Sequence, residues 1–275
     1  MKRVLIHVHI YYAEMWPELK ACLQNVFATT DCRLFVTIVA PNEALEKDIK
    51  AFCPAAAIEV VENRGFDIAP FPHILNKVDL QNFDYIVKLH TKRHITTKSF
   101  VFNGFDLSGD RWRQYLLAFC QTPENWQKTL RLLEGDSVTM VSECHLISDA
   151  DKSIDIPALR DFERRFGLVW RPHQAFVSGT MFAAKARLFL PLQHKISPAE
   201  FLPTTRDGTD KLPYLCEVLF GCLAPKNTIV SFDGKKASWR RGLAAFGRFI
   251  WRHKISPQKE IIKVCGIPIY RKKLK

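Results

Sequence analysis

Basic and imidazole side chains gather at the end of an apolar run between residues 84 and 94. The run consists almost entirely of β-forming residues, and the side chains there that can carry positive charge are Lys88, His90, Lys92, Arg93 and His94. Lysine offers a point charge and arginine a bidentate donor, so this set can neutralise phosphate oxygens without a metal ion. A solvated basic loop is the alternative. Ligands of open α/β sheets bind where the carboxyl ends of strands open into loops, which is where these residues are expected.

A second polar set follows the apolar run from Ala57 to Val61. Asn63 and Gly65 are residue types that accept unusual backbone angles, and the apolar spacing that follows predicts a helix with Asp67 near its start. The stretch therefore predicts a strand, a sharp loop and a helix. Arg64 offers a contact for a phosphate, a uracil or a thymine. Asp67 can cap the helix, or it can bind a ribose or a base.

The first predicted strand ends in groups that can bind a nucleotide. Residues 4–11 are rich in β-formers, and the mouth of this strand, His9 to Tyr12, supplies aromatic and hydrogen-bonding side chains, among them Tyr11. His7 and His9 share one face of the strand because side chains alternate along it. That face can equally belong to the core, with both histidines satisfied by hydrogen bonds.

Carboxylates that could act as a general base lie in the second half of the chain. Asp207 lies in a turn just ahead of a predicted helix, where it can face an open cleft. Glu217 lies within an otherwise apolar helix, where a carboxylate must be paired or functional. Glu143 ranks behind these two. The one literal Asp-x-Asp, at residues 149–151, has polar neighbours and is expected in a surface loop.

Strand and helix patterns alternate through the first half of the chain. The expected strands cover residues 4–11, 34–40, 58–61 and 85–89, and the expected helices between them cover 16–27, 44–52 and 67–78. Such alternation with continuous apolar strands predicts a parallel sheet covered by helices on both faces. The second half is less regular, with helices expected at 111–117, 125–133, 156–166 and 212–223 and strands at 137–142 and 176–183, the last interrupted at Ser178-Gly179.

The composition is that of a folded domain. The chain has 275 residues, 47% of them hydrophobic, which is enough for one large domain with or without an appendage. No window approaches the ~18 uninterrupted apolar residues of a membrane-spanning helix, and the N-terminal apolar run is too short for a secretory signal. The eight cysteines form no CxxC pair. We therefore expect buried free thiols in a reducing cytoplasm, and a cysteine spacing that supplies no clustered zinc ligands.

The net charge is confined to the end of the chain. Residues 235–275 contain 13 Lys and Arg and one acidic residue, so they carry the whole formal charge of +12 and leave residues 1–234 neutral. Within this tail, apolar residues at helical spacing between 239 and 254 predict a basic amphipathic helix, which suits the headgroup region of an anionic membrane. A helix packed on the main domain is one alternative. A nucleic-acid-binding arm is another, disfavoured by the neutral body.

Several of these stretches also carry a resemblance to a known family. The segments 7–12, 62–71, 84–94, 178–182 and 207–209 fall in the order found in the rhamnan-synthesis F family of bacterial polysaccharide glycosyltransferases, and the likeness extends over about residues 4 to 222. The resemblance implies a single GT-A-like, Rossmann-like α/β domain that binds nucleotide-diphospho-sugars. It also implies transfer of rhamnose or a related sugar onto a cell-surface polysaccharide or lipopolysaccharide.

The resemblance assigns roles to particular residues. Donor or nucleotide binding falls to His9, Tyr11, Asn63, Arg64, Gly65, Asp67, Lys88, His90, Lys92 and Arg93. Acceptor binding falls to Trp112, Arg113, Gly179 and Thr180, although a helix anchored by a buried tryptophan would explain Trp112 equally well. The base of an inverting reaction is Asp207 or Glu217. The division between them stays open because the helix around Glu217 lacks the family's usual His and Arg neighbours and contains Pro213.

The metal and the cellular location are expectations of the same kind. Many GT-A enzymes hold a divalent metal with an Asp-x-Asp at a strand end, but this chain has His90-Thr91-Lys92 at the corresponding place. We therefore expect no metal cofactor, with Mg or Mn as the alternative.

Residues 1–234 are expected to form the transferase domain and 235–275 a membrane-associating segment. The expected protein is cytoplasmic and peripheral on the anionic inner membrane, acts on a lipid-linked or lipopolysaccharide glycan, and binds no nucleic acid. A non-catalytic sugar-nucleotide or glycan-binding subunit of a polysaccharide assembly complex is the alternative.

Overall fold

The computed structural model divides the chain into two compact units. It describes residues 1–93, 101–102, 105–106, 110–149, 156–168, 174–204, 211–235, 251–256, 259–264 and 267–273. The first unit comprises Met1–Arg93 and Arg113–Lys235, and the second comprises His94–Trp112 and Lys236–Lys275. The residues that concern the candidate site lie almost entirely in the first unit.

A seven-stranded, mostly parallel sheet forms the centre of the first unit, in the order β11-β7-β10-β4-β1-β2-β3. Its strands are β1 (Arg3–Ile10), β2 (Asp31–Ile38), β3 (Ala57–Val60), β4 (Tyr85–His90), β7 (Met140–Ser142), β10 (Phe182–Lys185) and β11 (Ile229–Ser231). All neighbouring pairs are parallel except those of β10, which is antiparallel to both β4 and β7. The predicted parallel sheet is confirmed for the first four strands, and the mixed α/β architecture is compatible with a Rossmann-like fold.

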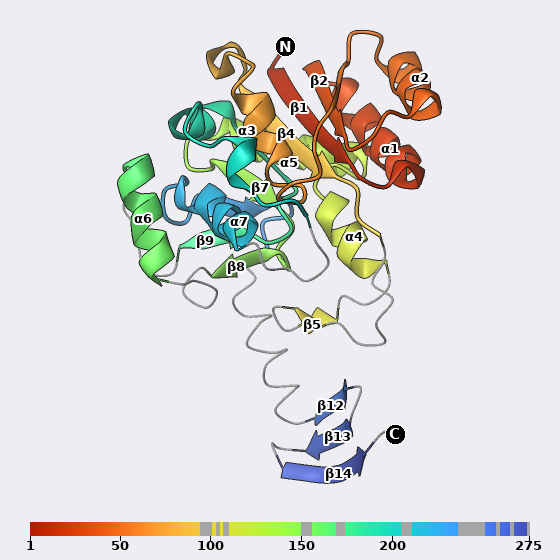
Figure 1. Ribbon diagram of the computed structural model, residues 1–275, viewed down its shortest axis with the longest axis vertical. Helices are drawn as coiled ribbons and strands as arrows, with labels where there is room; N and C mark the ends of the chain where they lie inside the picture. The colour runs from red at the N-terminus through yellow and green to blue at the C-terminus, as the bar shows by residue number, and fades with distance from the viewer. Residues whose placement is uncertain are drawn as a thin grey trace. The chain divides into compact units, whose positions relative to one another are not determined.

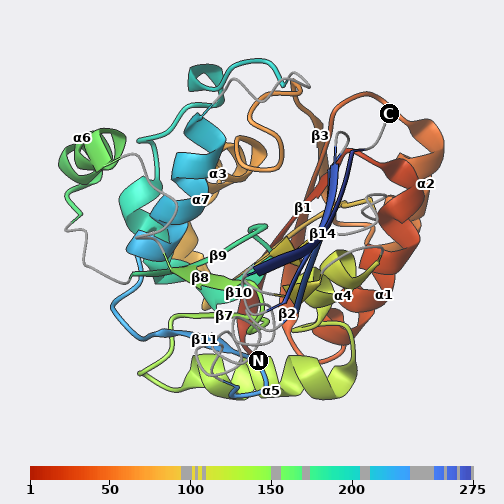
Figure 2. The same ribbon diagram turned by 90° about the horizontal axis from the view of Figure 1, so that it is seen from below.

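Helices cover both faces of this sheet. The helices of the described residues are α1 (Trp16–Phe27), α2 (Glu43–Phe52), α3 (Pro70–Leu75), α4 (Arg111–Leu117), α5 (Pro123–Glu134), α6 (Ile156–Phe166) and α7 (Leu212–Cys222), with short 3-10 turns η1 (Ala13–Met15), η2 (Leu80–Asn82), η4 (Ala186–Leu192) and η5 (Pro198–Glu200). In Figure 2, α1 and α2 lie on one side of strands β1 to β3, and α3 and α7 lie on the other. Local sequence fixes the helix starts. Pro17 stands in the first turn of α1, and the Asn42 side chain caps α2 by accepting from Leu45 N at 3.0 Å.

Four phenylalanines form the core beneath the carboxyl end of the sheet. Phe71 of α3 contacts Phe182 of β10, Phe189 of η4 and Phe220 of α7, with ring centroids 5.2 to 6.1 Å apart. All four side chains are buried, and full burial of a phenylalanine stabilises a fold by about 1.5–3 kcal/mol. This cluster therefore ties α3, α7 and β10 together on one face of the sheet.

The strand order creates a switch point between β1 and β4. Strands β1, β2 and β3 follow one another outward in one direction, whereas β4 lies on the opposite side of β1. In open α/β sheets, ligands bind outside the carboxyl ends of the strands at such a point. His9 at the end of β1 is in register with His90 at the end of β4, so the two imidazoles mark the edge where a site is expected.

Two predicted elements differ from the structure. Residues 176–183 form two strands in different sheets: β9 (Ala175–Val177) pairs with β8 (Ile147–Asp149), and β10 pairs with β4 and β7. The chain turns between them because Gly179 and Thr180 adopt positive φ angles of 80° and 50°. The helix predicted to begin near Asp67 begins at Pro70, and Ala69, not Asp67, is its N-cap. Helix capping, one of the two roles considered for Asp67, is therefore excluded, and contact with a ribose or a base stays a prediction.

The tail also differs from expectation. Three strands, β12 (Trp251–Ser256), β13 (Lys259–Val264) and β14 (Ile267–Lys273), form an antiparallel sheet, drawn in blue in Figure 1. The helix predicted for 239–254 is therefore wrong at residues 251–254, because the six register pairs of residues 251–256 with β13 hold the chain extended. Residues 239–250 lie outside the described residues. A further pair, β5 (Val101–Phe102) and β6 (Phe105–Asp106), forms a short hairpin. Within the described part of the chain, no helix has the length and apolar character to cross a bilayer.

Candidate active site

A buried ion pair lies at the carboxyl edge of the central strands. The Lys88 side chain on β4 is 1% exposed, and its Nζ lies 2.8 Å from Asp67 Oδ2. Nζ also donates to Thr180 Oγ1 at 2.7 Å and to the Thr180 carbonyl at 3.2 Å. Burial lowers the pKa of Lys88, and Asp67 opposes that shift. A buried cation with three acceptors is fully satisfied, so Lys88 holds the structure of this edge together instead of facing solvent.

Hydrogen bonds to the segment 201–204 hold the loop that carries Asp67 in place. Gly65 and Phe66 adopt positive φ angles of 57° and 55°. Gly65 N donates to Leu202 O at 3.4 Å, and Thr204 N donates to Asn63 O at 2.8 Å. A side chain at Gly65 would place its Cβ 2.5 Å from the Phe201 ring. The segment 201–204 and the glycine together set the turn that brings Asp67 to β4.

Asp67 is ionised and shared among three partners. Its Oδ2 accepts from Lys88 and from the Thr180 hydroxyl, and lies 3.5 Å from His90 Nε2. Burial opposes ionisation of Asp67, but the His90 ring, which is protonated in the acid range where Asp67 titrates, the charge of Lys88 and the two hydrogen bonds outweigh it and hold the pKa well below its usual range. The side chain is 20% exposed. Within the described residues, the hydrogen bonds and ion pairs of this carboxylate all fall on Oδ2.

His90 connects the end of β4 to the Gly179-Thr180 turn. Its Nε2 donates to the Gly179 carbonyl at 2.8 Å. Burial lowers the pKa of His90 to about 4, against the opposing charge of Asp67, so the ring is neutral at physiological pH. The positive φ angles of Gly179 and Thr180 turn the two carbonyls toward β4, where His90 and Lys88 bind them.

Glu217 of α7 reaches the same turn from the other side. Its Oε1 accepts the Gly179 backbone N–H. Burial raises the pKa of Glu217 to about 7, and the charge of Asp67 adds to the shift, while the Gly179 hydrogen bond and the charges of Lys88 and Lys92 oppose it. A carboxylate that titrates near neutrality can take and return a proton at physiological pH, as a general acid or base must.

The histidines of β1 are neutral and share one hydroxyl. His7 Nε2 and His9 Nδ1 each lie 3.0 Å from Thr37 Oγ1. Burial lowers the pKa of His9 to about 3 and that of His7 well below its usual range. His7 also stacks on Phe71, with ring centroids 5.8 Å apart. His7 is therefore a core residue, and His9 belongs to the floor of the edge next to His90.

The outer rim is formed by the loops after β1 and β4. Tyr11 N and Tyr12 N donate to Thr91 Oγ1 at 2.9 and 3.0 Å, which ties the two loops together. The Tyr11 side chain is 47% exposed. Arg93 pairs with Glu14 at 2.6 Å and lies over the Tyr12 ring. Lys92 is exposed and makes no ion pair with the described residues.

Other predicted site residues make their contacts outside this cluster. Arg64 pairs with Glu62 and donates to Phe201 O at 3.0 Å. It also lines a cavity of about 510 Å³ at the end of β3. Trp112 is buried, and Arg113 Nε lies 2.6 Å from Glu18 Oε2 of α1. Their contact with an acceptor stays a prediction.

The second base candidate, Asp207, lies outside the described residues. So do Ala150 and Asp151 of the literal Asp-x-Asp. Asp149 ends β8, which pairs with β9 in a separate two-stranded sheet.

The described residues at the end of β4 offer few of the ligands that a magnesium or manganese ion prefers. Both ions prefer several oxygen ligands, usually carboxylates. His90, Thr91 and Lys92 follow one another there, and the Asp67 carboxylate already has the Lys88 ammonium at 2.8 Å. A second cation at Oδ2 would compete with that ammonium.

A cluster that sequence analysis missed lies beyond β7. Glu143, ranked third as a base, hydrogen-bonds with His145, and Cys144 lies within contact of both. The signal in the sequence was three consecutive residues of metal-ligand type. Cysteine spacing alone did not reveal it.

Fold and site together define an α/β protein with a buried cluster of charged and polar side chains at the switch point of its main sheet. The model of the family described as "Rhamnan synthesis protein F" matches residues 1–125, which confirms the resemblance over that part of the chain. The match points to polysaccharide biosynthesis. It covers the residues from His9 to Arg93, whereas Gly179, Thr180 and Glu217 lie beyond it.

Two curated proteins from two strains of Xanthomonas campestris pv. campestris are also similar. Each is named "Uncharacterized protein WxcX" and is 25% identical to this chain over 190 residues. The alignment covers 67% of this chain but 26% of the relative. The chain thus spans about a quarter of the length of these relatives.

Proposed function

We propose that the protein is a glycosyltransferase with a GT-A-like fold. It moves rhamnose or a related sugar from a nucleotide-diphospho-sugar to a cell-surface polysaccharide or lipopolysaccharide acceptor. The family match supports a role in polysaccharide biosynthesis, and the order β3-β2-β1-β4 is that of a nucleotide-binding half-sheet. The observation that carries the proposal is Glu217, a carboxylate with a pKa of about 7 that contacts the turn above the switch point.

Glu217 is the base in this proposal. In an inverting reaction the acceptor hydroxyl oxygen bonds to the anomeric carbon, and the bond from that carbon to the diphosphate oxygen breaks. The hydroxyl proton passes to the Glu217 carboxylate, and the bonding electron pair leaves with the nucleoside diphosphate. The Gly179 N–H bond to Oε1 orients the carboxylate. Asp207 is the competing base, and separate variants distinguish the two.

Lys92 and Arg93 neutralise the leaving diphosphate. Lys92 is exposed beside the cluster and lowers the pKa of Glu217 through its charge. Arg93 would exchange Glu14 for phosphate at little cost, because an exposed ion pair is worth roughly 0–1 kcal/mol. Lys88 stays paired with Asp67 and positions Thr180. The chemistry therefore needs no magnesium or manganese at the end of β4.

The donor lies along the switch point between β1 and β4. The exposed ring of Tyr11 offers a stacking surface for the base, and Asp67 Oδ1 offers an acceptor for a ribose or sugar hydroxyl. His9 and His90 form the floor beneath them, with Asn63, Arg64 and Gly65 shaping the neighbouring loop. The acceptor lies against the Gly179-Thr180 turn, within reach of Glu217.

The protein works at the cytoplasmic surface of the inner membrane in this proposal. Its support is the charge of residues 235–275, which carry all of the formal +12. A Lys or Arg near an anionic surface contributes roughly 1 kcal/mol to attachment. The attraction does not depend on an amphipathic helix, so the sheet formed by β12 to β14 is compatible with it. A lipid-linked acceptor would be presented at the same surface.

Release of nucleoside diphosphate tests the proposal. The full chain is incubated with a panel of nucleotide sugars and extracted acceptor glycolipid, and release is measured with and without acceptor. We expect acceptor-dependent release from one class of donor. Tight nucleotide binding without release across the whole panel would contradict catalysis and favour a non-catalytic sugar-nucleotide-binding subunit.

A further inference from the structure

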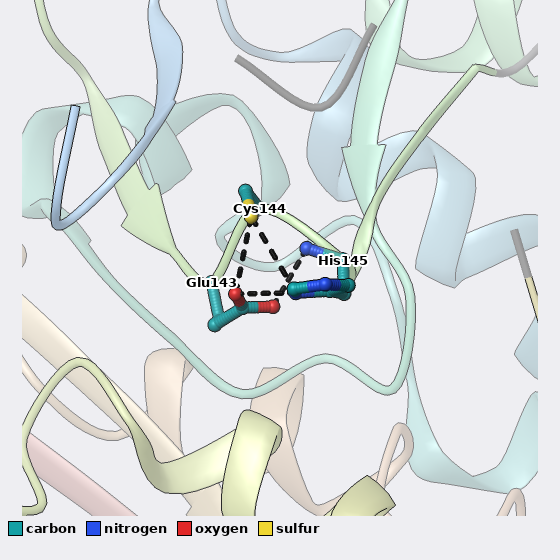
Figure 3. Close-up of side chains that lie close together, drawn as sticks. All are labelled: Glu143, Cys144 and His145. Atoms are coloured by element: carbon teal, nitrogen blue, oxygen red, sulfur yellow. Dashed lines mark hydrogen bonds and ion pairs between the residues drawn. The ribbon is translucent and has the colours of Figure 1, made fainter. Parts of the chain in front are cut away.

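Three consecutive side chains of metal-ligand type converge after β7. Figure 3 shows Glu143, Cys144 and His145 in one turn, with their polar atoms directed at one another. Glu143 Oε1 lies 2.6 Å from His145 Nδ1 and 3.1 Å from Cys144 Sγ, and Sγ lies 3.5 Å from Nδ1. The three residues are 5%, 1% and 8% exposed. A carboxylate, a thiol and an imidazole are thus held together out of bulk water.

This turn lies at the same edge of the sheet as the candidate site. Strand β10 is antiparallel to both β4 and β7, so β7 runs in the direction of β4 and ends at the same edge. Ser142 Oγ donates to Met181 O at 3.0 Å, and Ser178 N donates to Leu146 O at 2.9 Å. These bonds fix the turn against the residues on either side of Gly179 and Thr180.

The atomic spacing is close to that of a tetrahedral zinc site. With Zn–S of about 2.3 Å and Zn–N and Zn–O of about 2.0–2.2 Å, tetrahedral angles place sulfur about 3.5 Å from each of the other ligands and nitrogen about 3.3 Å from oxygen. The Sγ–Nδ1 distance of 3.5 Å already agrees. The distances from Oε1 to Sγ (3.1 Å) and to Nδ1 (2.6 Å) are shorter because hydrogen bonds join these atoms. Lengthening the two distances by about 0.4–0.7 Å would make room for the ion.

The surroundings also favour a soft divalent ion. The His145 ring stacks on Tyr115 with centroids 4.3 Å apart and planes at 7°, which fixes the direction of Nδ1. A thiolate and a carboxylate together match the charge of a divalent cation, which reduces the cost of burying all three. Sulfur and imidazole ligands select zinc-like ions over magnesium or calcium.

We propose that Glu143 Oε1, Cys144 Sγ and His145 Nδ1 bind a divalent transition-metal ion of the zinc type. Three protein ligands leave the fourth tetrahedral position for water or a bound ligand. The site is separate from the diphosphate contacts assigned to Lys92 and Arg93. It does not depend on the glycosyltransferase proposal, because metal binding is measured without any substrate.

Cobalt titration of the full chain tests this site. Protein stripped of metal is titrated with Co²⁺ alone, and we expect one equivalent to bind with thiolate-to-cobalt charge-transfer absorption that Zn²⁺ abolishes. Cys144→Ser should remove the absorption. Glu143→Gln should retain it while weakening binding, by at least the roughly 10- to 100-fold that loss of an outer-shell partner costs.

Matched variants elsewhere provide the controls. Cys32→Ser changes a half-buried thiol at the opposite end of the sheet, and His73→Gln changes an imidazole beside β3. Both should bind Co²⁺ like the parent protein. Folded parent protein that takes up no Co²⁺, or absorption that persists in Cys144→Ser, would overturn the proposal. Equal loss of absorption in Cys32→Ser would also overturn it.

Discussion

Replacement of Glu217 by glutamine separates the chemistry of this carboxylate from its structural role. The glutamine oxygen can still accept the Gly179 N–H, so the turn should keep its place. The amide cannot accept a proton from the acceptor. Loss of a general base typically reduces the rate about 10²- to 10⁴-fold, and we expect kcat to fall by that amount while nucleotide binding changes little.

The same substitution should stabilise the fold at high pH. The folded protein holds the Glu217 proton more tightly than the unfolded chain does, because its pKa is about 7 against an ordinary 4.5. Stability is therefore lost as the pH rises from 4.5 through 7, and above that range the buried charge costs roughly 3 kcal/mol. Glutamine imitates the protonated form. The variant should match the parent near pH 4.5 and exceed it by up to roughly 3 kcal/mol at pH 8.

Two assays on one variant test this reasoning. Nucleoside diphosphate release is followed from pH 5 to 9, and denaturant unfolding is measured at the two ends of that range. The parent rate should rise with pH and level off above about 7. Glu134→Gln, an exposed carboxylate on α5, should change neither quantity. A variant that keeps the parent rate, or that is no more stable than the parent at pH 8, would refute the assignment and return attention to Asp207.

Three further predictions follow from the loop after β4, the turn at Gly65 and the tail. Nucleoside diphosphate release should survive chelation, should not increase with added Mg²⁺ or Mn²⁺, and should fall at least tenfold in Lys92→Ala. Loss of release on chelation that either ion restores would contradict neutralisation of the diphosphate by side chains. In denaturant unfolding, Gly65→Ala should lower the free energy of unfolding by roughly 1–3 kcal/mol more than Gly234→Ala does. Both glycines have positive φ angles, but only a Cβ at residue 65 would meet another side chain, the Phe201 ring at 2.5 Å. Deletion of residues 236–275 should abolish binding to anionic vesicles in flotation while nucleotide binding persists, and added salt should weaken attachment of the full chain; an unfolded truncated protein would contradict this separation.

The first half of the fold could be predicted from the sequence because its signals are local. Apolar runs alternating with helical spacing fix β1 to β4, and parallel pairing follows from that alternation. The edge where His9 and His90 meet was predictable for the same reason. Glu217 could also be selected as a candidate base, because a carboxylate inside an apolar helix must be paired or functional.

The remaining contacts depend on residues far apart in the chain. Lys88 is a phosphate-binding candidate in sequence, yet Asp67 and Thr180 bind it, 21 and 92 residues away. The split of residues 176–183 depends on the left-handed conformation of Thr180, which its residue type does not predict. In the tail, apolar spacing indicated a helix, whereas strand pairing at 251–256 prevailed.

The central claim is that this chain transfers a sugar from a nucleotide donor. Mass spectrometry of extracted acceptor glycolipid, after incubation with the full chain and a panel of nucleotide sugars, tests it most directly. We predict an acceptor heavier by one deoxyhexose or hexose residue with the parent protein, and little or none with Glu217→Gln. An acceptor of unchanged mass throughout the panel, with nucleotide bound to folded protein, would contradict the claim.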